Sequence, residues 1–472
     1  MMNILNKKFR IKAFILFALL VITVQTINAQ QYLLLSDAIK TGLQNYQSIK
    51  AKQDYIKSSQ ALVKNTRNEY LPNVLAGIQQ AYGTVNSQFG PLSGYGAAGV
   101  ASSGPVFANQ SWNAAFGATY LVNTNWEVYS FGRLTSEIKL SQAQVTKDSA
   151  DLVQEEFIQS VKISGAYLNL LIAQRLIENA DSNLIRAESV QQSVLARTKS
   201  GLNAGVDSSI ANADVSSARL TLITANDNAQ QVSNQLIQLL NADASGNYLL
   251  DTTFFKMIPT QTNTTVDVTN NPQVKFYQTR IDQSKQATSY LKKSILPGVN
   301  LFGIYQTRAS GFDDNYTPSV AGAYTENYFN GINPTRSNYA LGFSLSWNIL
   351  SIKKVKEQAN AQNFLTQAYQ NEYDLISTQL KDESVFADQR IMNSMQSYHE
   401  VPTELKAASD AYLQKSVLYK NGLSTIVDLQ QAMYALNKAE TDASIAYINV
   451  WQALLLKAAA TGDFNLFLNQ VR

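Results

Sequence analysis

The chain has 472 residues, with no cysteine, one histidine and a formal net charge of +3 at pH 7. The absence of cysteine excludes disulfides and lipid-modified cysteine. Residues 1–29 contain four basic and no acidic side chains, so the rest of the chain has a net charge of −1, which excludes the basic footprint of a nucleic-acid-binding protein.

Residues 1–29 have the pattern of a secretory signal peptide. A basic region precedes an apolar run from Ala13 to Val24, and the small residue Ala29 marks the predicted cleavage site. An N-terminal membrane anchor is the weaker interpretation, because the run is too short to span a bilayer. No later segment offers a continuous apolar run long enough to be a membrane-spanning helix.

The remaining chain contains an internal repeat. Three pairs of motifs recur in the same order at a nearly constant offset, and several such pairs do not arise by chance. The pairs are Leu71-Pro72 with Leu296-Pro297, Trp126 with Trp347, and "GLNAGVD" at 201–207 with "GLSTIVD" at 422–428.

The first repeat, residues 30–250, is predicted to begin with a helix over 36–70. Leu71-Pro72 ends this helix, because proline blocks helix continuation and biases its predecessor to extended backbone. Two strands follow, then a long helix to Ser200, and another helix after Gly201. The strands are expected at 73–85 and 113–129, separated by a surface loop.

Residues 251–270 are predicted to link the repeats, as an equatorial segment. The second repeat, residues 271–472, has the same layout, with a helix, two strands, a long helix and a helix after Gly422. Its strands are expected at 298–307 and 339–350.

The stretch "NYALGFSLSWNIL" at 338–350 alternates bulky and small side chains with period two, which is typical of a strand. Its bulky face includes Phe343 and Trp347, and its other face is small and uncharged. The partner stretch at 113–126 places Tyr120 and Trp126 on its bulky face. This pattern favours a membrane barrel with these four residues toward lipid, over a soluble sandwich with the bulky face inward.

Four strands cannot close a barrel, since known barrels begin at about eight strands. The barrel must therefore be shared between chains, and the residues alone allow a dimer or a larger ring.

The duplicated helix–strand–strand–helix layout, the Leu-Pro pairs, the two "GLxxxxD" turns and the closing "YINVWQALLLKAAATGDF" resemble TolC-like outer-membrane efflux proteins, the outer membrane factors. The resemblance covers essentially the whole chain after the signal. It implies a mainly α protomer whose four β-strands enter a shared 12-stranded transmembrane barrel. A long α-helical coiled-coil tunnel would continue the barrel through the periplasm of a Gram-negative cell.

The resemblance also implies partners and sites. Gly201, Leu202, Gly422 and Leu423 would be the tips that contact a periplasmic adaptor, although each glycine can equally be a simple helix C-cap. The tunnel gate would include Tyr419 and Asp428, with Asp207 near the lock of the closed state. Two positions depart from the family pattern. Gln431 replaces a second gate aspartate, and Ser424 replaces the locking arginine.

Catalysis has little support, because the chain lacks a metal-ligand spacing, a phosphate-binding glycine loop and a nucleophile motif. We expect no cofactor and no metal. The predicted function is the exit duct of a tripartite efflux or type I secretion system, a homotrimer in outer-membrane lipid. It would be a passive conduit, coupled through the adaptor to an inner-membrane pump of the RND or ABC type. The alternative is a non-conducting, envelope-spanning coiled-coil or adhesin.

Overall fold

The computed structural model describes residues 31–86, 107–242, 248–260, 267–317, 319–320 and 322–471. The predicted signal peptide and most of the first hairpin loop lie outside the described residues. The chain divides into two compact units. Unit 1 holds the described residues up to Tyr55 together with residues 148–278 and 371–471, and unit 2 holds Ile56–Lys147 and Thr279–Gln370. Each unit therefore contains parts of both sequence repeats.

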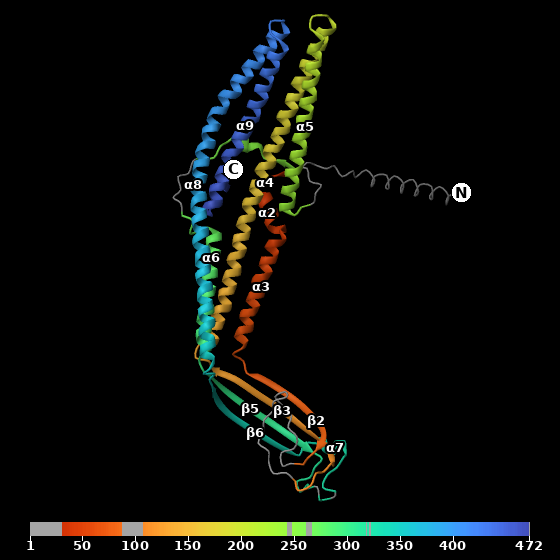
Figure 1. The fold of residues 1–472 in the computed structure, drawn as a ribbon, viewed down its shortest axis with the longest axis vertical. Helices are drawn as coiled ribbons and strands as arrows, with labels where there is room; N and C mark the ends of the chain where they lie inside the picture. Colours follow the sequence, from red (N-terminus) through yellow and green to blue (C-terminus); the bar gives the residue numbers. More distant parts are fainter. Residues whose placement is uncertain are drawn as a thin grey trace, which may run out of the picture. The chain divides into compact units, whose positions relative to one another are not determined.

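Unit 2 contains a four-stranded antiparallel sheet made of two hairpins, one from each repeat (Figure 1). Its spatial order is β2-β3-β5-β6, so β3 and β5 join the repeats at the centre. The strands are β2 (Asn73–Thr84), β3 (Ala114–Tyr129), β5 (Gly298–Ser310) and β6 (Arg336–Ser346).

A short helix from the second hairpin loop, α7 (Tyr328–Ile332), lies on the end of the sheet distant from the long helices (Figure 1). The Tyr120 hydroxyl donates to the Ile332 carbonyl at 3.0 Å, and the Tyr328 ring meets the Phe116 ring edge-on. A Cβ on Gly331 would lie 2.5 Å from the Phe116 carbonyl oxygen, so only glycine permits this close approach.

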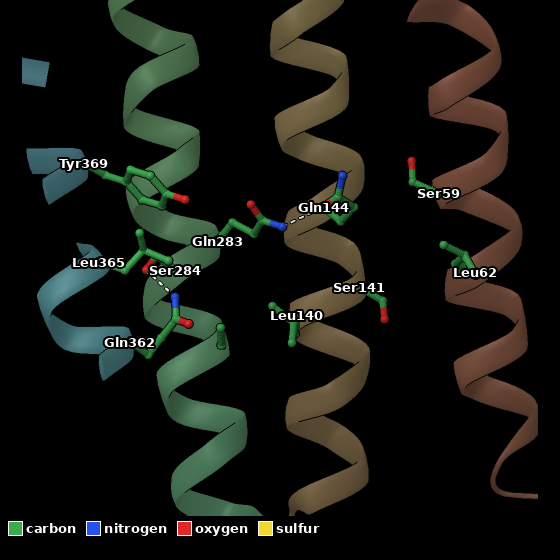
Figure 2. Close-up of a pocket in the computed structure, with 11 residues that line it drawn as sticks. Ser59, Leu62, Leu140, Ser141, Gln144, Gln283, Ser284, Gln362, Leu365 and Tyr369 are labelled. Carbon is green, nitrogen blue, oxygen red and sulfur yellow. Dashed lines mark hydrogen bonds between the residues drawn. The ribbon is translucent and has the colours of Figure 1, made fainter. Parts of the chain in front are cut away.

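The helices of unit 2 lie side by side in the order α3-α4-α6-α8 (Figures 1 and 2). Polar side chains join the neighbours. Thr66 contacts Ser141 at 3.1 Å, and Ser284 contacts Thr366 at 2.7 Å. These helices therefore associate partly through hydrogen bonds rather than through a continuous apolar core. They are α3 (Gln47–Asn68), α4 (Arg133–Lys199), α6 (Pro272–Ser294) and α8 (Ser351–Lys420).

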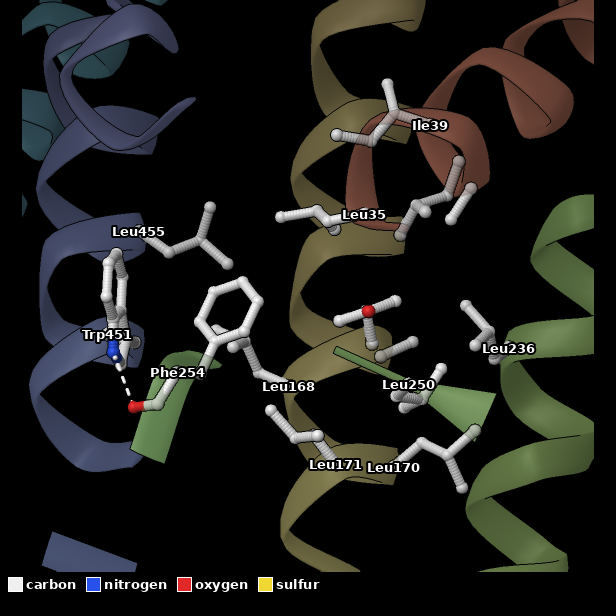
Figure 3. Packing of buried hydrophobic residues seen from close by; sticks show 14 of the residues in the cluster. Leu35, Ile39, Leu168, Leu170, Leu171, Leu236, Leu250, Phe254, Trp451 and Leu455 are labelled. Atoms are coloured by element: carbon white, nitrogen blue, oxygen red, sulfur yellow. Dashed lines mark hydrogen bonds between the residues drawn. The ribbon is translucent and has the colours of Figure 1, made fainter. Parts of the chain in front are cut away.

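Unit 1 has the main apolar core (Figure 3). Helix α4 contributes Leu168 and Leu171, while α9 contributes Trp451, whose indole N–H donates to the Phe254 carbonyl at 3.1 Å. Helix α9 spans Ile426–Thr461. The other elements around the core are α2 (Leu35–Asn45), α5 (Gly205–Leu240), α10 (Asn465–Leu468) and the 3-10 turn Thr252–Phe255.

Two very short strands, β1 (Gln31–Leu33) and β4 (Tyr248–Leu250), pair in parallel beside this core. Tyr167 anchors them, because its buried hydroxyl donates to the Leu33 carbonyl at 2.8 Å and accepts from the Asp251 amide at 2.9 Å. Both hydrogen-bonding functions of the buried phenol are thus satisfied.

Some element bounds differ from the sequence-based expectation. The expected helix over 36–70 is interrupted at Tyr46, where the backbone is extended (φ −66°, ψ 121°). Strand β6 ends at Ser346 and not at Leu350, because Asn348 caps the next helix by accepting from the Ser351 amide. Helix α8, by contrast, has the expected length and contains Pro402. Within the described residues, no helix combines the length and apolar character needed to cross a membrane.

Candidate functional site

The two faces of the sheet differ in chemistry. Residues directly opposite each other in an antiparallel ladder point to the same side, so the register assigns every side chain to a face. One face, here called the apolar face, carries Val74, Ile78, Tyr82, Phe116, Tyr120, Val122, Trp126, Leu301, Tyr305, Tyr339, Leu341, Phe343 and Leu345. The opposite face carries four large apolar residues, Leu75, Leu121, Phe302 and Ile304, but most of its residues are small or polar. The polar ones include Asn73, Gln79, Thr119, Asn123, Asn125, Asn300, Gln306, Arg308, Asn338, Ser344 and Ser346.

Three of the four residues predicted to face lipid lie on this apolar face. Trp126 pairs opposite Leu301, which in turn pairs opposite Phe343, a side chain that is 77% exposed. Tyr120 is on the same face, but α7 partly covers it. Trp347 lies one residue beyond the end of β6, so the strand register does not assign it to either face.

The two tryptophans make the same hydrogen bond in the two repeats. Trp126 donates its indole N–H to the Tyr70 carbonyl at 2.7 Å, and Trp347 donates to the Ile295 carbonyl at 2.9 Å. Each acceptor is the residue just before a Leu-Pro pair, where a helix gives way to a strand. The tryptophans therefore fix both helix–strand joints, a role that their aromatic character alone did not reveal.

Both predicted tips are glycine-terminated helix ends of the same type. Gly201 (φ 72°) and Gly422 (φ 74°) adopt the left-handed conformation. The following leucine amides donate five residues back, Leu202 to Arg197 and Leu423 to Leu418, both at 2.9 Å. This is the Schellman arrangement, which satisfies the last helical carbonyls. The glycines are thus C-caps, and they leave Leu202 and Leu423 70% and 74% exposed.

Arg197 joins the first tip to the second. Its guanidinium donates to the Lys420 carbonyl at 2.9 Å and to Asn203 Oδ1 at 2.8 Å, and it lies 5.6 Å from the centre of the Tyr419 ring. No motif singled out Arg197, although a cation in the last turn of a helix is a recognised partner for free carbonyls.

Tyr419, predicted to belong to the gate, is only 3% exposed and packs with Val194 and Leu429. Its hydroxyl accepts from Asn203 Nδ2 at 3.1 Å, and Asn203 also donates to Asp207 at 2.9 Å. Burial raises the pKa of the Tyr419 phenol. Tyr419 and Asp207 are therefore brought together through Asn203, inside the paired tips.

Asp428 occupies the third position of α9 and completes a capping box with Thr425. Its carboxylate accepts from the Ser424 hydroxyl at 3.0 Å and lies 3.7 Å from the Lys415 ammonium. The Ser424 hydrogen bond, followed by those from Thr425, holds the pKa of Asp428 below its usual range. Ser424, which replaces the expected arginine, is thus a partner of Asp428. Gln431 is exposed on the same helix.

Unit 2 also contains a cavity of about 450 Å³ among its four long helices (Figure 2). Its lining combines amide and hydroxyl groups with the apolar side chains of Leu62, Leu140 and Leu365. Gln283 donates to Gln144, and Gln362 donates to the Ser284 hydroxyl at 2.7 Å. Because these groups are paired with one another, the cavity is a gap in a hydrogen-bonded helix contact. The described residues contain no group of three or more acidic, histidine or cysteine side chains placed to hold a metal ion.

Solved structures of outer-membrane channels share this fold. VceC from Vibrio cholerae superposes with a TM-score of 0.71 at 15% identity, covering 91% of this chain and 96% of that one. The CmeC channel of Campylobacter jejuni gives 0.71 at 14% identity, covering 91% and 85%. The open state of the MtrE channel of Neisseria gonorrhoeae gives 0.70 at 16% identity, covering 91% and 88%.

No curated protein matches the chain at a significant level. The family model described as outer membrane efflux protein matches residues 38–242, which comprise most of the first repeat. The remainder repeats the same layout and completes the same fold. Residues 38–242 therefore resemble the outer membrane efflux protein family, and the chain as a whole has the fold of the solved outer-membrane channels.

Proposed function

We propose that the chain is one protomer of an outer-membrane exit duct for an efflux or type I secretion system. The carrying observation is the sheet of unit 2, which has one apolar face, one polar face and two edge strands without a strand partner among the described residues. In water such a sheet would expose large apolar side chains and invite aggregation. In a ring of copies within lipid, the apolar face meets hydrocarbon and the polar face surrounds water.

The family resemblance supports three copies, which would give 12 strands. The edges support such a ring, because β2 and β6 run in opposite directions within the sheet. Joining β6 of one copy to β2 of the next would continue the antiparallel pattern around the barrel. Joining like edges about a two-fold axis would invert one copy and send its helices to the opposite side of the membrane.

The tips support coupling to a periplasmic adaptor and, through it, to an inner-membrane pump of the RND or ABC type. Leu202, Val206, Leu423 and Val427 are exposed apolar side chains next to the two glycine caps. Exposed apolar side chains gathered at one end of paired helices fit a protein partner better than free solvent. The duct itself would be passive and would use no cofactor.

Asp428 and Gln431 are the proposed gate residues that remain available to the tunnel mouth. One Asp428 per chain would make a single ring of three carboxylates, which favours cations. Tyr419 and Asp207 would act behind this ring, by holding the two tips of one protomer together.

The test is single-channel recording of the purified protein in planar bilayers. We expect stable conductance, cation preference, and moderate block by hexamminecobalt added on the periplasmic side. Asp428→Ala should weaken the block with assembly intact, whereas Asp442→Ala, an acid elsewhere on α9, should not. An assembled oligomer without conductance would favour the non-conducting structural protein, and equal block of Asp428→Ala and wild type would remove Asp428 from the mouth.

A further inference from the structure

Five lysines gather at the helix–strand joint of the second repeat. Lys292 and Lys293 are in the last turn of α6, and Lys353, Lys354 and Lys356 are in the first two turns of α8. All are exposed except Lys293, which is half-buried. We call this group the lysine patch. Glu357 is the one acidic residue within these two helix ends.

The two halves of the lysine patch are neighbours in space. Gly298 at the start of β5 pairs with Ser346 at the end of β6, so α6 ends and α8 begins on the same side of the sheet. The Trp347 indole, which lies shortly before the start of α8, donates to Ile295, one residue beyond the end of α6. Hydrogen bonds of Ser284 with Thr366 and with Gln362 hold the same helices together further along.

The first repeat neutralises its basic residue at the equivalent place. At the offset that relates Trp126 to Trp347, Lys354 corresponds to Arg133, which forms ion pairs with Glu127 at 2.5 Å and with Glu137 at 3.1 Å. The positions of these glutamates in the second repeat are Asn348 and Gln358. Accordingly, no ion pair forms on any lysine of the patch within the part of the chain that the structure describes.

Lys353 and Lys354 also oppose the dipole of their own helix. The first turn of a helix carries partial positive charge, which favours acidic and disfavours basic side chains. Helix α8 has no acidic residue in this turn. The excess positive charge is thus locally unfavourable, and no ion pair among the described residues offsets it. Such a conflict between local preference and sequence is expected at functional positions.

Apolar side chains directly precede the patch. Trp347 is 54% exposed and Leu350 is 89% exposed, and both lie between the end of β6 and the start of α8. Aromatic and apolar residues followed by exposed lysines match a membrane–water boundary, where aromatic rings lie at the headgroup level and lysines reach outward to anionic groups. The alternative source of charge, an acid on a neighbouring copy, would not require these exposed apolar residues.

We propose that the lysine patch binds the phosphate groups of anionic phospholipids in the leaflet nearest the long helices. This proposal rests on the proposed function, since it needs the sheet to lie in a membrane. The binding would fix the depth of each protomer at its second repeat, while Glu127 and Glu137 offset the positive charge of Arg133 at the equivalent place in the first repeat.

The test uses native mass spectrometry of the purified full-length oligomer, titrated with phosphatidylglycerol and phosphatidylcholine that have identical acyl chains. Wild type should retain phosphatidylglycerol preferentially. K353Q/K354Q should lose this preference by roughly fivefold per lysine, and K353R/K354R should keep it. The matched control K381Q/K406Q removes two lysines from distant turns of α8 and should behave as wild type.

A second measurement does not depend on the folding of any variant. The phosphatidylglycerol preference of wild type should fall as the salt concentration rises, because ions screen exposed charges. Inorganic phosphate at the same concentration as the lipid should not displace it, since it lacks the apolar chains that meet Trp347 and Leu350. Displacement by phosphate would show a soluble-anion site and overturn the proposal.

Two further outcomes would contradict the lysine patch as a lipid site. One is an unchanged phosphatidylglycerol preference in K353Q/K354Q. The other is dissociation of the K353Q/K354Q oligomer with its lipid preference intact, which would assign the lysines to contacts between copies. A wild-type chain that forms no membrane-inserted oligomer would instead overturn the proposed function, before the lysines are tested.

Discussion

Arg197 makes several contacts from the first tip to the second. It donates to the Lys420 carbonyl and lies beside the Tyr419 ring of the second tip, and it also donates to Asn203 of its own tip. A guanidinium suits this place because its planar fork can bind several acceptors at once and also contact an aromatic face.

Arg197→Ala should loosen the second tip. We expect faster amide hydrogen exchange over 417–425 and a larger open probability in planar bilayers, because the free carbonyls at the end of α8 lose a donor. Arg219→Ala is the control, since Arg219 pairs with Glu188 in solvent and touches neither tip. Unchanged exchange at 417–425 would show that packing of Tyr419 alone holds the tips.

The Asp428 carboxylate makes the stability of the start of α9 depend on pH. Its pKa is lowered in the folded protein, so its contribution to stability is complete above the unfolded value of 3.8 and is lost as the pH falls through the lower folded value. Asp428→Asn should therefore raise amide exchange at the start of α9 relative to wild type at pH 5. The difference should shrink as the pH falls below 3.8, with rates corrected for intrinsic exchange. A difference that stays constant with pH would mean that the charge of Asp428 does not stabilise the cap.

Helices α8 and α9 are joined by a lysine that is almost completely buried. Lys457 donates to Asp388 at 2.6 Å, and its side chain is 4% exposed while that of Asp388 is 52% exposed. Removing one partner of such a pair leaves an uncompensated buried charge, whereas replacing the buried partner by an apolar group of similar length avoids that cost.

Asp388→Asn should therefore destabilise the protein more than Lys457→Met, by roughly 1–3 kcal/mol. The comparison is made from denaturant midpoints of the helical signal of the assembled protein. The double variant should resemble Lys457→Met, because the aspartate has no buried charge left to neutralise. If Lys457→Met is the more damaging change, then the hydrogen bond from the Lys457 ammonium to the Ser384 carbonyl, at 3.4 Å, and the packing of the lysine side chain contribute more to stability than the ion pair.

Strand β6 allows the two faces of the sheet to be tested with adjacent residues. Phe343 is on the apolar face and Ser344 on the polar face. Phe343→Lys should impair membrane insertion, at a cost of up to about 2–4 kcal/mol, and Ser344→Lys should be tolerated in a water-filled pore. Folding yield into lipid vesicles measures both. Equal yields would mean that the apolar face does not meet lipid.

The features that could be predicted from the sequence are those determined by residues close together in the chain. Period-two alternation and the Leu-Pro pairs located four strands to within a few residues, and the glycines located both helix reversals. The break at Tyr46 was missed because the flanking residues are ordinary helix formers. The β1–β4 pair was missed because such short strands carry no periodicity, and the two strands lie at opposite ends of the first repeat. The partners of Asp428 and Trp126 depend on three-dimensional contacts that spacing does not reveal.

At the scale of the whole molecule, two edge strands remain to be satisfied. Strands β2 and β6 present unpaired backbone groups and large exposed side chains, which are costly in lipid unless the sheet closes. The joining of unlike edges is a heterologous contact, and it must close into a ring or grow without limit. A trimer closes it with 12 strands, and this closure separates a channel from a filament.

Engineered cysteines can detect this contact cleanly, because the chain has no native cysteine. We expect Ile78→Cys on β2 to form a disulfide with a cysteine on the apolar face of β6 in the next copy. A disulfide needs roughly 4 Å between the two Cβ atoms. The register between copies decides which residue of β6 comes this close to residue 78, so the second cysteine is placed in turn at positions 337, 339, 341 and 343.

Because β2 would meet β6 and not another β2, Ile78→Cys alone should give only monomer on denaturing gels. The best double variant should give monomer, dimer and trimer, and at full oxidation a single species of three chains. A ladder continuing beyond three would indicate an open filament, and a ladder ending at two would indicate an eight-stranded ring. Cross-linking of Ile78→Cys by itself would show that like edges pair, which would place the helices of neighbouring copies on opposite sides of the membrane and contradict the proposed duct.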